Sequence, residues 1–124
     1  MPKKIRIRAG NVEAEALLND SRTAQAIWDA LPIEGSGSKW GEEIYFPIPV
    51  QAELEDGQEE VEVGTLGYWP PGSALCIFFG PTPVSQSDQP RAASPVTLVG
   101  EVSGDAKIFQ EVSSGTKIIV EKAE

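Results

Sequence analysis

The clearest pattern in the chain is a strict alternation of apolar and polar positions close to its start. Two runs, over 4–8 and 12–18, place apolar residues at every second position, which is typical of strands with one buried face. Between them, Gly10-Asn11 favours a two-residue hairpin turn. The resulting register sets opposite charges across the two strands, where each pair contributes roughly 0.2–1 kcal/mol: Arg8 with Glu13, and Arg6 with Glu15.

A helical pattern follows the hairpin. The cluster Asn19-Asp20-Ser21 offers N-cap side chains, and Pro32 marks the end of the pattern. Between them, four apolar residues recur at helical spacing and form one face: Ala24, Ile27, Trp28 and Leu31. We therefore expect a helix with Trp28 in its buried stripe, closing one mouth of the sheet or barrel that the strands form.

Shorter strands are expected over the next part of the chain. The Gly- and Ser-rich segment 33–40 predicts irregular structure, and 40–50 predicts a strand. The two faces of that strand differ: Ile44, Phe46, Ile48 and Val50 on one, Glu43 and Tyr45 on the other. Because its two prolines cannot donate ladder hydrogen bonds, we expect it at an edge, a bulge or a barrel corner. An acidic turn over 53–62 leads into a strand that begins at Val61 and Val63.

The longest uncharged apolar run lies within the aromatic, Gly- and Pro-rich stretch Gly64–Pro83. It predicts a short strand, a tight turn at Pro70-Pro71-Gly72 and a strand over 74–79 that is apolar on both faces and so fully buried. The elements expected after it are a polar loop over 84–93, a strand over 96–102, a short helix over 105–112 and a last strand around 118–120. Seven or eight short strands with Gly/Pro turns favour a mainly β, closed or nearly closed barrel.

Composition narrows the functions that the chain can have. It has 124 residues, the size of a single domain over 1–124, with one cysteine, no histidine and a net charge of −9. Histidine is the commonest metal ligand and general base, and no phosphate-loop pattern occurs, so we expect no metal and no other cofactor. The acidic charge disfavours nucleic acid and membrane as partners. The lone cysteine and the lack of a signal-peptide pattern indicate a cytoplasmic protein.

The negative charge is unevenly distributed along the chain. No Lys or Arg occurs between Lys39 and Arg91, whereas this interval holds nine acidic residues. One interpretation is a solvated surface that keeps the protein soluble. The other is a negative field around a site that prefers cationic or neutral ligands.

Aromatic residues beside glycines, prolines and loop ends are the best candidates for a binding site. Half-exposed Trp and Tyr rings line apolar pockets with a few polar tips, and such a pocket suits a proline-containing peptide or a small apolar ligand. The alternative is that these rings plug the barrel ends. Glu43 is a candidate general acid or ligand contact, with Tyr45 as donor, against the alternative of an edge-strand glutamate facing solvent. Cys76, in an apolar strand, is expected to be an inert core thiol.

Two motifs give the chain a family resemblance: Gly67-Tyr68-Trp69-Pro70-Pro71-Gly72 and Phe79-Gly80-Pro81-Thr82-Pro83. With Trp40-Gly41-Glu42-Glu43-Ile44-Tyr45-Phe46, they resemble a family of small prokaryotic cyclophilin-like proteins over nearly the whole chain. The resemblance implies a closed eight-stranded antiparallel barrel with a helix at its opening, in agreement with the strand count. True cyclophilins are prolyl isomerases with a catalytic arginine in the strand that corresponds to Glu43–Pro47, which has none. Efficient isomerase activity is therefore not expected.

Three hypotheses for function follow from these patterns. The first is a non-catalytic module that binds a peptide or small molecule through a set of aromatic side chains: Trp40, Tyr45, Tyr68, Trp69 and Phe79. The second is an atypical enzyme, either a weak prolyl isomerase or a small-molecule acid/base catalyst that uses Glu43 and Tyr45. The third is an assembly role through exposed strand edges. The sequence does not determine the oligomeric state.

Overall fold

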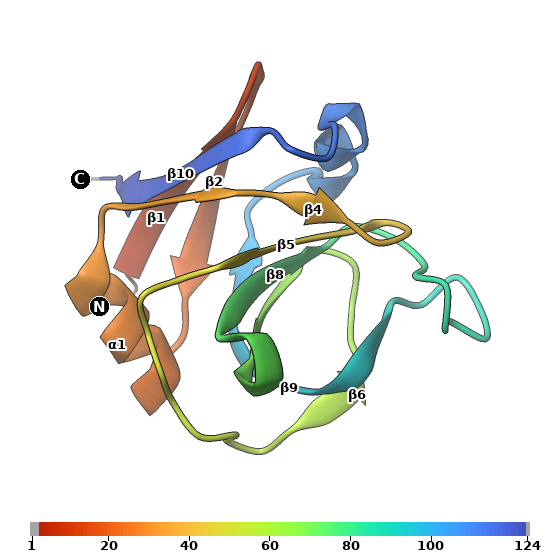
Figure 1. Ribbon diagram of the computed structural model, residues 1–124, viewed down its shortest axis with the longest axis horizontal. Helices are drawn as coiled ribbons and strands as arrows, with labels where there is room; N and C mark the ends of the chain where they lie inside the picture. The colour runs from red at the N-terminus through yellow and green to blue at the C-terminus, as the bar shows by residue number, and fades with distance from the viewer. Residues whose placement is uncertain (1–2, 124) are drawn as a thin grey trace.

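The computed structural model describes residues 3–123 and shows a mainly β fold built on one long, curled antiparallel sheet (Figure 1). Its elements, in chain order, are β1 (Lys3–Ala9), β2 (Val12–Leu18), α1 (Arg22–Ala30), β3 (Ile33–Ser36), β4 (Ser38–Lys39), β5 (Glu43–Pro47), β6 (Gln58–Glu60), β7 (Thr65–Trp69), the 3-10 helix η1 (Pro70–Gly72), β8 (Ala74–Phe78), β9 (Arg91–Val102), the 3-10 helix η2 (Ala106–Glu111) and β10 (Lys117–Lys122). None of the helices in this described part is both long and apolar enough to cross a membrane.

The N-terminal hairpin has the predicted register. Ala9 faces Val12 across the turn, and Arg6 and Arg8 face the expected glutamates. The charges pair differently in detail, because β10 flanks β1 on its other side. Arg6 keeps the predicted pair with Glu15, at 3.9 Å, but its Nε lies closer to Glu13 Oε2, at 3.1 Å. Arg8 Nη2 lies 3.1 Å from Glu121 of β10. Strand β1 is therefore a central strand, and its basic side chains pair with acidic side chains of both neighbouring strands, β2 and β10.

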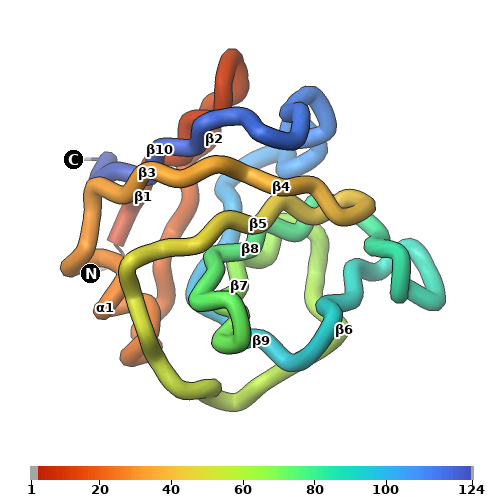
Figure 2. Tube along the Cα trace, in the orientation of Figure 1, coloured from red at the N-terminus to blue at the C-terminus, as the bar shows by residue number. Residues whose placement is uncertain are grey.

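The sheet curls so far that the strands at its two ends, β3 and β4, are consecutive in the chain. The strand order is β3-β10-β1-β2-β9-β7-β8-β5-β4, and β3 and β4 are separated only by Gly37. The segment 33–39 thus pairs with β10 through its first half and with β5 through its second (Figure 2). The sheet is not closed by hydrogen bonds between β3 and β4. The chain itself connects its two ends through Gly37, and we call this junction the seam. The sequence predicted this cyclophilin-like barrel in general form. The part of the chain that the structure describes has ten strands, whereas seven or eight were expected.

Segment 33–40 was wrongly predicted to be irregular, because its glycines suggested flexibility. They serve close packing across the seam instead. A Cβ on Gly35 would lie 2.9 Å from Cδ2 of the Phe46 ring, and one on Gly37 would lie 3.1 Å from Cγ2 of Ile44. The Gly37 amide also donates to the Thr116 carbonyl at 2.9 Å. A glycine that admits a neighbouring side chain is indistinguishable, in sequence, from a glycine in a loop.

Both predicted helices are present and bury apolar side chains in the barrel core. Ser21 caps α1, with its Oγ accepting from the Ala24 amide at 3.1 Å, and Ile27 is fully buried. Trp28 packs against the core but is only half-buried, with Lys122 Nζ 4.7 Å from its ring centroid. The second predicted helix is present as η2, a 3-10 helix that buries Phe109.

A second, smaller layer lies on the outer face of the sheet. The first residues of β9 turn away from β7 and pair with β6, and a small apolar cluster fills the space beneath: Val61, Cys76, Phe78, Ala92 and Val96. Two predictions were wrong here, since β9 begins at Arg91, inside the expected loop, and β6 lies inside the expected acidic turn. Strand β7 begins at Thr65, after the expected start. An ion pair between Arg91 and Glu59, 3.1 Å apart, links β9 to β6.

Candidate functional site

Alternation along β5 separates the barrel core from the candidate site. Ile44 and Phe46 are fully buried in the core. Glu43 and Tyr45 point to the opposite, outer face, as the sequence predicted. There Tyr45 lies directly across from Cys76 of β8. The outer face of β5 and β8 is therefore where polar and aromatic side chains meet.

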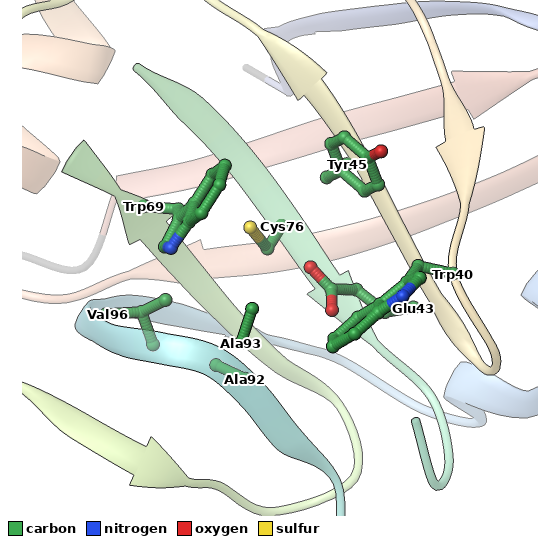
Figure 3. Close-up of a pocket in the computed structure, with 8 residues that line it drawn as sticks. All are labelled: Trp40, Glu43, Tyr45, Trp69, Cys76, Ala92, Ala93 and Val96. Carbon is green, nitrogen blue, oxygen red and sulfur yellow. The ribbon is translucent and has the colours of Figure 1, made fainter. Parts of the chain in front are cut away.

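These side chains line a cavity of about 280 Å³ between the barrel and the outer layer (Figure 3). Figure 3 shows the Glu43 carboxyl pointing toward Cys76, in the space between two indole rings. The cavity is lined by Trp40, Glu43, Tyr45, Trp69, Cys76, Ala92, Ala93 and Val96. It is thus an apolar, aromatic-walled hollow with one carboxyl group in it.

The Trp69 ring is held in place from two sides. Its Nε1 donates to Ser94 Oγ at 2.7 Å. Gly72, in the turn that follows β7, lies against the ring, since a Cβ there would be 2.9 Å from Cε3 and Cζ3. The Trp-Pro-Pro-Gly motif therefore supplies both the ring and the support that fixes its orientation.

Trp40 lies in the loop between β4 and β5, and the second motif anchors that loop. The Glu42 amide donates to the Pro81 carbonyl at 2.9 Å, and the Phe79 amide donates to the Glu42 carbonyl at 3.0 Å. Gly41 adopts a φ of +63°, and a Cβ there would lie 2.7 Å from Pro83 Cδ. The Phe-Gly-Pro-Thr-Pro segment thus positions one wall of the cavity without lining it.

Glu43 is the most unusual residue in the cavity. It is only 5% exposed, and its Oε1 is the one buried side-chain nitrogen or oxygen in the described residues that has no hydrogen-bond partner. Burial raises the pKa of this carboxyl to about 7, and a hydrogen bond from the Cys76 thiol lowers it in part. The pKa of Cys76 is raised well above its usual value, first by burial and then by the Glu43 charge. At neutral pH the carboxyl is therefore poised between its two protonation states.

The structure brings together four of the six candidate residues from the sequence: Trp40, Glu43, Tyr45 and Trp69. Tyr68 and Phe79 do not lie at the rim as expected, because both are fully buried in the barrel core. The hydroxyl of Tyr68 donates to the Val50 carbonyl at 2.7 Å. Glu43 does not face solvent on an edge strand either, since β5 lies between β4 and β8 and the cavity walls cover it.

Sequence reasoning missed the part of the cavity that β9 supplies. Ala92 and Ala93 fall at the end of the expected polar loop over 84–93, and Val96 was expected only as the first residue of a strand. Ala92, Ser94 and Val96 occupy every second position, as residues on one face of a strand do. Pro95, between the last two, instead suggested a loop. Cys76 was expected in the core, and it is buried as expected, but it also forms part of the cavity wall. No cluster of three or more potential metal ligands occurs within residues 3–123.

Comparison with known proteins places the chain in a family. A family model described as Cyclophilin-like matches residues 3–121, so the chain belongs to the Cyclophilin-like family. The fold is also similar to the solution structure of a hypothetical protein from Archaeoglobus fulgidus, at 38% sequence identity and a TM-score of 0.83. That match covers 98% of this chain and 95% of the archaeal one. No curated protein matches the chain.

Proposed function

We propose that this cyclophilin-like protein is a binding module whose ligand, a short peptide segment or a small molecule, occupies the cavity around Glu43. The observation that carries the proposal is the Glu43 carboxyl, which lines an aromatic-walled hollow and whose buried Oε1 has no hydrogen-bond partner. A buried carboxyl oxygen without a partner costs about 1–3 kcal/mol, and a ligand that donates a hydrogen bond to this group would remove that cost. Two fixed indole walls add apolar contact area.

The same cavity offers little for efficient prolyl isomerisation. That reaction is accelerated by a donor set against the prolyl nitrogen, and the residues that line the cavity include no arginine or lysine. Tyr45 and Trp40 offer neutral donors only. The proposed module therefore binds without efficient isomerase activity.

The three tryptophans of the chain make a direct test of the proposal. Indole N–H signals of Trp40 and Trp69 report on the cavity, whereas Trp28, which lies on α1 beside Lys122 and does not line the cavity, is an internal control. We expect titration with short Xaa-Pro peptides and small aromatic molecules to shift the first two signals and leave the Trp28 signal unchanged. Equal shifts at all three indoles, or no shift with any compound, would reject a binding site in this cavity.

A second candidate function rests on the pKa of Glu43. A carboxyl that titrates at about 7 can both donate and accept a proton at neutral pH, as a general acid/base catalyst must. In this hypothesis Glu43 transfers the proton and the Tyr45 hydroxyl donates a hydrogen bond to the substrate. A protease-coupled prolyl isomerisation assay indistinguishable from the blank would eliminate the isomerase version of this hypothesis.

A further inference from the structure

We infer that the ligand of this cavity is an apolar organic ammonium ion, with its N–H donating to Glu43 and its apolar part between the tryptophan rings. The inference rests on the proposed function and names the chemical class of the ligand. It follows from three features of the molecule: the carboxyl without a counter-ion, the ring set around it, and the charge of the surrounding chain.

The carboxyl has no cation of its own. Among the described residues, the basic side chains on the elements around the cavity are engaged elsewhere. Lys39 Nζ donates to the Gln110 carbonyl at 3.3 Å. The other two form ion pairs outside the cavity: Arg91 with Glu59 at 3.1 Å, and Lys107 with Glu42 at 3.5 Å. Among the described residues, the Cys76 thiol is the only group that lowers the pKa of Glu43, so a cation that pairs with the ionised carboxylate has to come from a bound molecule.

The ring set favours a cation over a neutral molecule of the same shape. Trp40, Tyr45 and Trp69 all line the cavity, and the faces of such rings attract cations, by about 0.5–2 kcal/mol depending on desolvation. Glu43 adds a charge-assisted hydrogen bond, which is roughly twice as strong as a neutral one. An ammonium ion with at least one N–H satisfies both groups at once.

The wider charge distribution points the same way. The chain carries a net charge of −9 and has no basic residue between Lys39 and Arg91, the interval that supplies most of the cavity walls. Such a field raises the local concentration of cations and opposes anions. The cavity volume of about 280 Å³ fits a small molecule or a single residue with its amino group.

The test compares three probes of nearly equal shape and different charge: benzylamine, benzyl alcohol and benzoate. At about pH 8, where Glu43 is ionised, we expect benzylamine to bind at least about tenfold more tightly than benzyl alcohol, and benzoate not to bind. Between about pH 6 and about pH 8 the affinity for benzylamine rises about tenfold, because only the ionised carboxylate is a counter-ion. Calorimetry and the indole signals of Trp40 and Trp69 measure both effects.

Two isosteric variants separate the cavity from the net charge. Glu43→Gln removes the carboxylate in the cavity, and Glu42→Gln removes a neighbouring charge that is bonded to Gln110 and Lys107 outside it. We expect Glu43→Gln to lose the preference for benzylamine and its pH dependence, while Glu42→Gln keeps both. Equal affinity for amine and alcohol, or affinity that falls as pH rises, would overturn the ammonium inference and leave the binding module standing. Failure of all three probes to bind would count against both proposals.

Discussion

The Glu43 carboxyl and the Cys76 thiol share the outer face of the sheet, and each changes the protonation of the other. Burial raises the pKa of Glu43 to about 7, and the thiol's hydrogen bond lowers it in part. Burial also raises the pKa of Cys76, and the Glu43 charge raises it further. The pair therefore keeps its proton on sulfur, and Cys76 acts as a hydrogen-bond donor to Glu43 and not as a nucleophile.

Replacing the thiol with a stronger donor should shift the titration of Glu43. In Cys76→Ser the hydroxyl hydrogen-bonds the carboxylate better than S–H does, so we expect the pKa of Glu43 to fall below about 7. Carbon-13 NMR of the carboxyl carbon during a pH titration measures the midpoint. Cys76→Ala is the control, since it removes the donor, and its Glu43 midpoint should be no lower than that of the wild type. A lower midpoint in the alanine variant would mean that water entry, not the donor, controls this pKa.

The burial of Glu43 predicts a specific pH dependence of stability. A carboxyl with a folded-state pKa above its unfolded value binds more protons when folded. Its stabilising effect is thus present at low pH and lost as pH rises from about 4.5 to about 7. This shift corresponds to about 3 kcal/mol. We expect the free energy of unfolding of Glu43→Gln to equal that of the wild type near pH 4.5. Above pH 7 it should exceed the wild-type value by up to about 3 kcal/mol.

Urea denaturation of both proteins across this pH range measures the difference, in which the titration of all other groups cancels. Glu42→Gln is the matched control, and its difference from the wild type should not grow in the same way. A constant difference for Glu43→Gln at all pH values would show that Glu43 has the same pKa in the folded and unfolded states, so that burial does not raise it.

The parts of the fold that could be predicted from sequence are those with local signals. The hairpin over 3–18 combines strict alternation with a Gly-Asn turn, and α1 combines a cap, a stripe and a proline. Strand β8 was recognisable because all five of its residues are apolar. In each case the pattern within one segment determines the structure, with no need to know its partner.

The missed elements depend on partners distant in the chain. Strand β6 is three polar residues that form a strand only because β9 pairs with them, and β3 pairs with β10 more than eighty residues later. The site shows the same limit. Glu43 was assigned to the correct face of β5, but its burial depends on walls from β7, β8 and β9. Tyr68 and Trp69 lie on opposite faces because they are neighbours in one strand, but which of the two is fully buried depends on the assembled sheet.

Glu55 should stabilise the start of α1 from outside the helix. Its carboxylate accepts from the Thr23 amide at 2.9 Å, the Thr23 hydroxyl at 2.8 Å and the Arg22 amide at 3.3 Å. These bonds, those from Thr23 first, lower the pKa of Glu55. A lowered pKa contributes stability above the unfolded value of 4.5 that is lost as pH falls through the folded one. We therefore expect Glu55→Ala to lower the denaturation midpoint at neutral pH and to approach the wild type in acid.

The control for this experiment is Glu53→Ala, which removes an exposed carboxylate from the same loop. Its midpoint should stay close to that of the wild type at both pH values. If the two variants behaved alike, the effect would reflect the charge of the loop and not the bonds to α1.

Tyr68 belongs to the motif that defines the family resemblance, and its position in the core predicts a role in stability. Its hydroxyl donates to the Val50 carbonyl at 2.7 Å and accepts from the Ala52 amide at 3.2 Å. Tyr68→Phe leaves both backbone groups without a partner, so we expect a loss of about 1–3 kcal/mol in the free energy of unfolding. Tyr45→Phe is the matched control, since the Tyr45 side chain is only half-buried and lines the cavity. We expect Tyr45→Phe to unfold close to the wild-type midpoint, and a larger loss there than in Tyr68→Phe would contradict the assignment of Tyr68 to the core and Tyr45 to the site.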